Sequence, residues 1–145
     1  MALLLYIIVG FMPAGATDYK ISANIRIPSI NLSSDVTELQ RDGRKLHTPE
    51  TIVGSYTEAE NKILLIGHSV TVFENLDQLV IGDEIWYDGR EYRIEDITVP
   101  KKEQINMNKV LKSEETDTLV LMTCAGEDLG AGDATHRLIL TAKAV

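Results

Sequence analysis

The sequence predicts a mainly β domain, built as a barrel or a sandwich. About six to eight short strand-like segments follow one another along the chain, which is the spacing typical of such folds. Only two short stretches show helical periodicity, and no long amphipathic helix is predicted. With 145 residues, 44% of them hydrophobic, the chain is long enough to bury the core of one domain.

The first half of the chain contains the weaker strand signals. Residues 21–27 alternate apolar and polar side chains, as a half-buried strand does, and Pro28 ends the segment. Residues 31–50 are polar and irregular, and the Asp-Gly pair at residues 42–43 predicts a turn between short strands. Residues 51–54 are a weak strand candidate.

The middle of the chain predicts one hairpin and two short helices. Residues 84–87 and 91–94 flank an Asp-Gly pair, which is a strong signal for a two-residue hairpin turn. Residues 72–79 and residues 104–111 carry apolar side chains at helical spacing. Each of these two stretches therefore predicts a short amphipathic helix.

Two apolar runs and a final apolar segment predict the core strands. Residues 63–69 and residues 118–124 are short, apolar and rich in β-branched side chains, which suits strands buried on both faces. Residues 137–142 form the last predicted strand. Residues 126–133, which are rich in Gly, Asp and Glu, predict a loop between the last two strands.

Three residues with catalytic chemistry stand at the ends of these core strands. His68 and Cys124 lie at the ends of the first two, and Arg137 opens the third. A cysteine nucleophile reacts as the thiolate, which nearby positive charge favours, and His68 and Arg137 can supply that charge. A lone cysteine is by itself more often a small buried residue, so the prediction depends on all three residues together.

Composition and motifs argue against several classes of function. The net charge of −8 and the pI near 4.8 argue against a nucleic-acid-binding protein, which needs a basic face for phosphates. The sequence contains no phosphate-binding glycine loop and no CxxC or HExxH pattern. Its single cysteine cannot form an intramolecular disulfide.

At these residues the chain resembles the sortases, the cysteine transpeptidases of bacterial cell surfaces. Residues 118–124 (TLVLMTC) resemble the family's TLxTC signature, although the segment is longer when it is counted from its first threonine. Residues 67–69 (GHS) resemble the GH motif, residues 27–30 (IPSI) resemble the IPxI segment, and Arg137 lies in a hydrophobic strand. The resemblance runs from about residue 25 to the C-terminus, and it is greatest to the smaller sortases grouped as classes D, E and F.

The resemblance implies an eight-stranded β-barrel, with a catalytic domain over residues 17–145. It implies that Cys124 attacks the threonine carbonyl of an LPxTG-like sorting motif and forms a thioacyl-enzyme. His68 would protonate the departing amine and deprotonate the incoming one, while Arg137 would steady the substrate and the oxyanion. An amine from a peptidoglycan precursor or a pilin lysine would then resolve the intermediate, so the implied protein partners are surface proteins or pilins that carry the motif.

The resemblance also suggests residues that contact the substrate. Thr123, beside the nucleophile, is expected near the substrate, although it can equally be an ordinary strand residue. Ile105 and Met107 are expected to line the apolar pocket for the leucine of the motif. His136 precedes Arg137 on a strand, so the two side chains should face opposite ways. This alternation favours His68 as the catalytic histidine.

No cofactor or resident metal is expected. Glu91, Glu95, Asp96 and Glu103 could bind calcium, as some sortases do. Clustered acidic residues of this kind are more simply explained as a solvated face. We therefore predict no metal requirement.

Residues 2–11 are the most hydrophobic run in the chain. The run lacks the basic start of a signal peptide and is shorter than the about 20 apolar residues that span a bilayer. Residues 1–16 are either the remnant of an N-terminal anchor, or a strand or helix that packs on the domain. The resemblance implies the anchor, which would hold the protein at the extracytoplasmic face of the bacterial membrane.

Two other functions stay open at this point. One is a cysteine peptidase on the same barrel that cleaves peptides without amine transfer. The other is a non-catalytic β-barrel in which Cys124 is part of the core.

Overall fold

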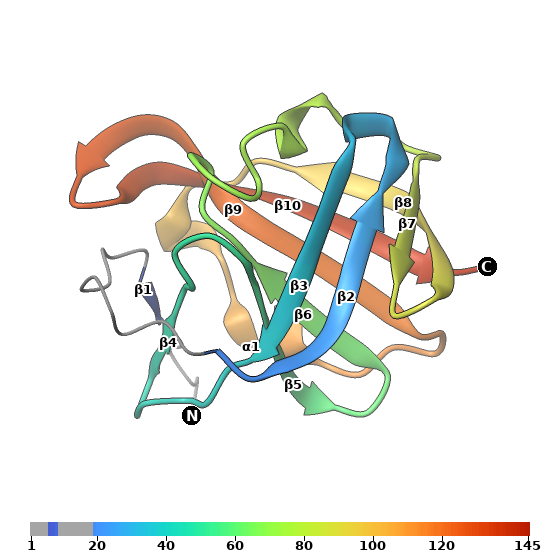
Figure 1. Cartoon of the computed structure of the whole chain (residues 1–145). Coiled ribbons are helices and arrows are strands. Elements are labelled where there is room, and N and C mark those ends of the chain that lie inside the picture. Colours follow the sequence, from blue (N-terminus) through green and yellow to red (C-terminus); the bar gives the residue numbers. More distant parts are fainter. Residues whose placement is uncertain (1–5, 9–18) are drawn as a thin grey trace.

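The computed structural model describes residues 6–8 and 19–145, and its centre is a closed β-barrel (Figure 1). The strands that form the barrel are β2 (Ile21–Ile27), β3 (Leu32–Glu38), β5 (Val53–Ala59), β6 (Lys62–Ile66), β7 (Glu84–Tyr87), β8 (Arg90–Thr98), β9 (Thr118–Gly130) and β10 (Asp133–Ala144). Their order around the barrel is β10-β8-β7-β2-β3-β5-β6-β9, and β9 closes the ring by pairing with β10. The prediction of a mainly β, eight-stranded barrel is confirmed.

Strand β6 and the first half of β9, residues 118–123, are parallel neighbours that are buried on both faces. Leu65 and Leu121 belong to the main apolar cluster, which fills the barrel. Leu64 and Val120 point the other way, into a second apolar cluster that also contains side chains of the short helix α1 (Met107–Leu111). Burial on both faces explains why the two strands are almost continuously apolar in sequence.

The predicted hairpin in the middle of the chain is present as β7 and β8. Its two turn residues, Asp88 and Gly89, both have positive φ angles, of 50° and 83°. A two-residue turn of this kind matches the right-handed twist of the flanking strands.

The prediction of two short helices is only partly correct. Helix α1 lies inside the predicted segment 104–111 and follows a 3-10 turn, η3 (Lys102–Gln104). Residues 72–79, in contrast, form turns around a short 3-10 helix, η2 (Leu76–Gln78). One further 3-10 turn, η1 (Pro28–Ile30), connects β2 to β3.

The turns before η2 begin at His68. The amides of Thr71 and Phe73 both donate to the carbonyl oxygen of His68, over 3.3 and 3.0 Å. This pairing folds the chain back tightly, so no α-helical ladder forms there. The apolar side chains of Phe73 and Leu76, which suggested a helix, are buried in the main cluster instead.

The prediction for residues 31–50 is only partly correct, because short strands were expected beside the turn at residues 42–43 but no strand was expected at the start of the stretch. This region contains β3, which pairs with β2 and β5, and β4 (Lys45–His47). Strand β3 buries Leu32, Val36 and Thr37 but carries Ser, Asp and Glu elsewhere. Its apolar residues are too few to show the alternation of a strand in the sequence.

The prediction of a loop over residues 126–133 is also wrong. β9 continues past Cys124 to Gly130, and β10 begins at Asp133, not at Arg137. The two strands form a hairpin arm that extends beyond the barrel, seen at the upper left of Figure 1. Its outer part is exposed, so it has no apolar pattern by which a strand is recognised.

Beside the barrel, β1 (Tyr6–Ile8) pairs in parallel with β4, and Ile8 lies opposite His47. The other residues of the predicted N-terminal segment, and its boundary at residues 16–17, lie outside the described residues. None of the helices in the described part of the chain has the length and apolar character needed to cross a bilayer.

Candidate active site

Cys124 and Arg137 occupy directly opposite positions on the antiparallel pair β9–β10. Residues opposite one another on such a pair point to the same face, with Cβ atoms about 4.5–5.5 Å apart. Both residues line a cleft at the edge of the barrel. The predicted association of the thiol with the guanidinium therefore follows from the strand register.

His68 approaches from the other neighbour of β9. The parallel ladder between β6 and β9 ends with Ile66 opposite Met122. His68 and Cys124 each lie two residues beyond this last pair, and a hydrogen bond between Thr123 and Gly67 keeps the two segments adjacent. Cys124 thus sits between a strand that carries Arg137 and a chain segment that carries His68.

Gly67 is bonded to β9 and packed against the turns that follow His68. The hydroxyl of Thr123 donates to the carbonyl oxygen of Gly67 over 2.7 Å, in a buried hydrogen bond. A Cβ atom at position 67 would lie 2.7 Å from a methyl of Val72 and 2.8 Å from the ring of Phe73. Only glycine fits at this position without moving its neighbours, so close packing explains why a glycine precedes His68.

Burial makes both Cys124 and His68 neutral at pH 7. Desolvation raises the pKa of the Cys124 thiol. The positive charge of Arg137 lowers this pKa by a smaller amount, and the negative charge of Asp133 raises it by a smaller amount. Desolvation lowers the pKa of His68, while a hydrogen bond to the backbone of Thr48 partly offsets this change. The resting pair is therefore a thiol and an uncharged imidazole.

The guanidinium of Arg137 is buried and held from three sides. Its Nη2 donates to the carboxylate of Asp133 over 2.8 Å, and its Nη1 donates to the carbonyl oxygens of Ala134 and His136, each over 3.0 Å. Asp133 also accepts a hydrogen bond from Nζ of Lys102 over 2.6 Å. The buried cation thus has a charged partner, as burial of a charge requires.

Asp133 and Lys102 were not predicted from the sequence. In a regular strand, residues four apart are about 13 Å apart, which is too far for an ion pair between Asp133 and Arg137. Two irregularities in β10, on either side of Ala134, bend the strand and bring the two side chains together. The only available signal was the general need of a buried arginine for a nearby carboxylate.

The cleft beside Cys124 is narrow in this conformation. It is lined by Thr48, Ile66, Gly67, Met122, Thr123, Cys124 and Arg137. The space open to the centre of a water molecule is about 10 Å³, which is close to the least that can hold one water. The cleft as described therefore has room for about one water molecule.

The predicted substrate-contacting residues differ in their positions. Thr123 lines the cleft. Met107 is buried in the second apolar cluster, and Ile105 packs against that cluster, which includes Ile66 and Met122. Ile105 and Met107 thus lie behind the wall of the cleft and do not line it in this conformation.

His136 lies apart from the cleft, as alternation along the strand predicts. It pairs with Ala125, the residue after Cys124 on β9. Its Nδ1 lies 2.6 Å from the hydroxyl of Thr135, and it is not among the described residues that line the cleft. His68 is not among the described residues that line the cleft either, so the choice of His68 over His136 still depends on the alternation along the strand.

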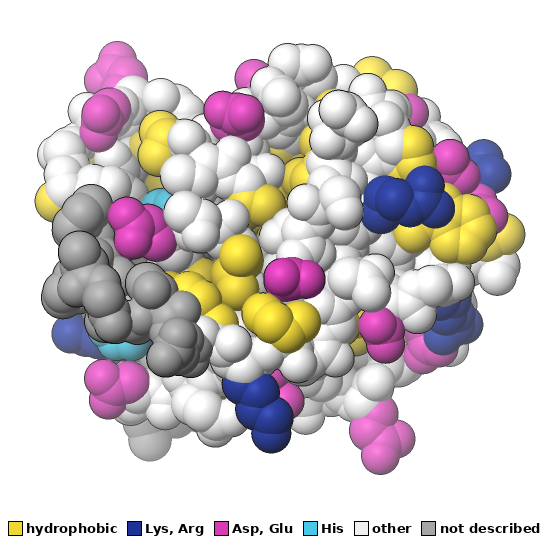
Figure 2. Space-filling view, viewed as in Figure 1, with side chains coloured by type: hydrophobic (Ala, Val, Ile, Leu, Met, Phe, Trp, Pro, Cys, Tyr) yellow, Lys and Arg dark blue, Asp and Glu magenta, His cyan; other side chains and the backbone are white. Residues whose placement is uncertain are grey.

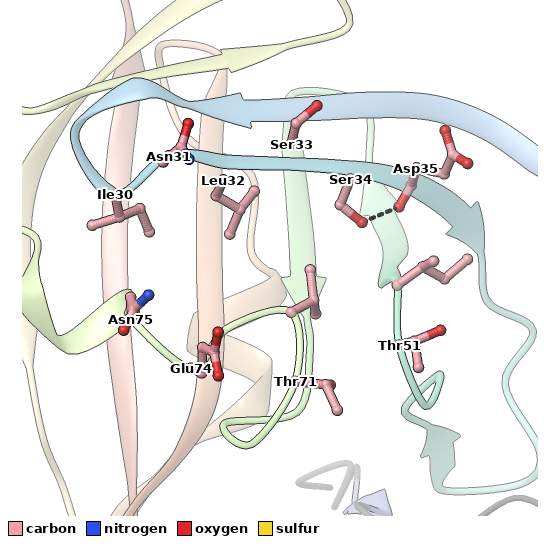
Figure 3. Close-up of a pocket in the computed structure, with 12 residues that line it drawn as sticks. Ile30, Asn31, Leu32, Ser33, Ser34, Asp35, Thr51, Thr71, Glu74 and Asn75 are labelled. Carbon is pink, nitrogen blue, oxygen red and sulfur yellow. Dashed lines mark hydrogen bonds between the residues drawn. The ribbon is translucent and has the colours of Figure 1, made fainter.

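A larger hollow of about 480 Å³ lies between β3 and the turns that follow His68 (Figure 3). Ser33 and Asp35 on one side and Glu74 and Asn75 on the other make its lining mainly polar. Cys124, His68 and Arg137 do not line it. This hollow is thus distinct from the cleft beside the thiol.

Charge on the surface agrees with the acidic composition. On the face seen in Figure 2, Asp and Glu side chains are scattered among apolar ones, and Lys and Arg side chains lie apart from one another. Within the described part of the chain, no group of three or more His, Cys, Asp or Glu side chains is placed to hold a metal ion.

The comparisons with known proteins agree with this geometry. Residues 25–145 match the family model of the sortase domain. The chain is 30% identical to sortase C-1 from Actinomyces oris, with a TM-score of 0.66 over 86% of this chain and 72% of that chain. A search of curated proteins found no match.

Two further solved structures share the fold. A lid mutant of sortase A from Corynebacterium diphtheriae has a TM-score of 0.69 at 22% identity, over 91% of this chain and 74% of that one. Sortase C1 from Streptococcus agalactiae has a TM-score of 0.66 at 21% identity, over 86% and 67%. The assignment to classes D, E and F stays a prediction. The barrel, the match over residues 25–145 and the 30% identity to a sortase of known structure lead to one conclusion: this chain belongs to the sortase family.

Proposed function

We propose that the protein is a cysteine transpeptidase that cleaves an LPxTG-like sorting motif between Thr and Gly and transfers the acyl part to an amine. One observation carries the proposal: Cys124 on β9 has Arg137 opposite it on β10 and the His68 segment on its other side. Membership of the sortase family supports transpeptidation as the reaction type.

The first half of the reaction forms a thioester. Because Cys124 and His68 are both neutral at rest, His68 takes the thiol proton as the sulfur attacks the threonine carbonyl. The C–N bond of the tetrahedral intermediate then breaks. The imidazolium of His68 gives its proton to the departing glycine amine, which leaves the acyl group on sulfur.

The second half reverses the roles. An incoming amine attacks the thioester, His68 accepts its proton, and the C–S bond breaks to release Cys124. The imidazole returns that proton to the sulfur, so the neutral pair is restored. Water in place of the amine would give hydrolysis, and the two outcomes differ only in the acceptor.

Arg137 stabilises the oxyanion that forms in both halves. An arginine has five N–H donors, and three of those of Arg137 are engaged by Asp133, Ala134 and His136. Two donors remain for a substrate carbonyl or the developing oxyanion. Asp133 fixes the guanidinium, so these donors need no reorganisation during the reaction.

The substrates follow from the family. The motif-bearing partner is a surface protein or a pilin, and the acceptor is an amine of a peptidoglycan precursor or a pilin lysine. The protein would act at the extracytoplasmic face of the bacterial membrane, held by an N-terminal anchor. No cofactor takes part in these steps.

The reading of Cys124 as a core residue fits the structure poorly. Its side chain is only partly buried, and it belongs to neither apolar cluster. Transfer and simple hydrolysis are distinguished by the products from an LPxTG peptide with and without added triglycine. The proposal predicts a peptide–triglycine conjugate. Hydrolysis alone at every triglycine concentration would instead identify a peptidase.

A further inference from the structure

Thr48 carries an unusual polar atom. It follows β4 directly, and its side chain is 2% exposed. Among the described residues, its hydroxyl is the only buried side-chain polar atom without a hydrogen-bond partner. Buried polar groups almost always have a partner, and leaving one without a partner is destabilising. The hydroxyl therefore needs an explanation.

The position of Thr48 supplies one. Thr48 lines the same narrow cleft as Cys124 and Arg137. Ile66 and Met122, on other walls of this cleft, offer no hydrogen-bonding group of comparable strength. The cleft is thus the space beside Thr48 from which a partner for its hydroxyl can come.

A second contact ties Thr48 to the catalytic residues. The ring of His68 hydrogen-bonds the backbone of Thr48, and this bond raises the pKa of the imidazole. A hydrogen bond that raises the pKa of the imidazole is one that the ring donates to a carbonyl oxygen, because such a bond favours the protonated ring. The backbone of Thr48 therefore orients His68, while its side chain borders the cleft that holds Cys124.

We propose that Thr48 is a substrate-binding residue whose hydroxyl donates a hydrogen bond to a backbone carbonyl oxygen of the acyl segment in the cleft. A carbonyl is the suitable partner because each residue of a peptide has one, whereas a proline in the motif has no N–H. The inference rests on the proposed function, since it takes the occupant of the cleft to be a sorting peptide.

Thr48→Val tests the hydroxyl alone, because valine keeps the shape of threonine and the backbone carbonyl stays in place. We expect kcat/KM for a sorting peptide to fall about fivefold to tenfold, the effect of one neutral hydrogen bond. The melting temperature should stay the same or rise, because the variant removes a buried group without a partner. Thr48→Ser, which keeps the hydroxyl, should restore most of the lost activity.

Thr37→Val is the matched control. Thr37 is also buried, but its hydroxyl donates to the carbonyl oxygen of Lys20 over 2.8 Å, and it does not line the cleft. This variant should lower the melting temperature and leave kcat/KM unchanged. The two variants therefore have opposite patterns of stability and activity if the inference is correct.

Binding separates this inference from the proposed reaction. In a Cys124→Ala background, which removes the chemistry, Thr48→Val should raise the Kd of the sorting peptide by about fivefold to tenfold. If Thr48→Val leaves both Kd and turnover unchanged, the inference is wrong. A lower melting temperature of Thr48→Val would also contradict it, because it would show that the Thr48 hydroxyl has a hydrogen-bond partner within the fold. A wild-type protein that forms no thioacyl adduct would contradict the proposed function, while the Kd comparison would still decide the role of Thr48.

Discussion

Asp133→Asn removes the negative charge beside Arg137 and keeps the size of the side chain. Asp133 accepts hydrogen bonds from Nη2 of Arg137 and from Nζ of Lys102, over 2.8 and 2.6 Å. An amide oxygen can still accept a hydrogen bond, but it has no charge to attract two cations. We expect the guanidinium of Arg137 to lose its fixed orientation and the turnover of a sorting peptide to fall.

The loss of stability can be worked from the pKa of Asp133. Burial would raise this pKa, but the hydrogen bonds from Lys102 and Arg137 outweigh it and lower the pKa from 3.8 to about 2. Such a difference corresponds to at most about 2.5 kcal/mol. The side chain is 38% exposed, so solvent screening reduces the contribution to roughly 1 kcal/mol. Because the pKa is lower in the folded protein, this stabilisation is present above about pH 4 and disappears as the pH falls toward 2.

Three measurements test this account. Urea unfolding at pH 7 should show Asp133→Asn to be less stable by roughly 1 kcal/mol, and the difference should shrink below about pH 4. Alkylation of Cys124 by iodoacetamide should become roughly two- to fivefold faster at pH 8, because the charge of Asp133 raises the pKa of the thiol. kcat/KM should fall despite the more reactive thiol. Wild-type kcat/KM and alkylation in a variant with the predicted stability loss would show that Asp133 has only a structural role.

Three further predictions concern the residues around the thiol. Arg137→Lys should reduce turnover by about a hundredfold or more. It should also lower the melting temperature, because a lysine cannot replace the three hydrogen bonds of the buried guanidinium. A variant with wild-type turnover would exclude Arg137 from the site. His68→Ala should abolish turnover while His136→Ala has little effect, and the reverse result would identify His136 as the catalytic histidine. Gly67→Ala should destabilise the fold by about 1–3 kcal/mol, because the added methyl overlaps packed neighbours; urea unfolding measures this, and wild-type stability would contradict the packing argument.

The core of the barrel could be predicted from the sequence because its signals are local. Strand β6 and the first half of β9 are almost continuously apolar, since both their faces are buried. The turn between β7 and β8 has an Asp-Gly pair that suits positive φ angles. In each case the residue pattern depends only on the element itself.

The missed elements depend on distant parts of the chain. Strand β3 has few apolar residues, and its pairing with β2 and β5 stabilises it. The outer part of the β9–β10 arm is exposed, so pairing between the two strands and not burial explains its structure. Backbone hydrogen bonds do not leave a pattern in the sequence, so both regions were expected to be irregular.

The site likewise contains residues that the sequence indicated and residues that it did not. Cys124, His68 and Arg137 were predicted from their chemistry and their places next to core strands. Asp133 reaches Arg137 only because β10 is irregular there, and Thr48 reaches the cleft only because the connection from β4 to β5 passes it. Contacts of this kind depend on the closed barrel, and no local pattern in the sequence reports them.

The central claim is that Cys124 forms a thioester with a sorting motif. The most direct test is mass spectrometry of the intact protein and of its peptides after incubation with an LPxTG peptide in the absence of an added amine. A thioester at Cys124 predicts a mass increase equal to the acyl fragment that ends in threonine, located on Cys124 and absent from Cys124→Ala. Cleavage of the peptide by Cys124→Ala at the wild-type rate, or an acyl adduct on any other residue, would contradict it.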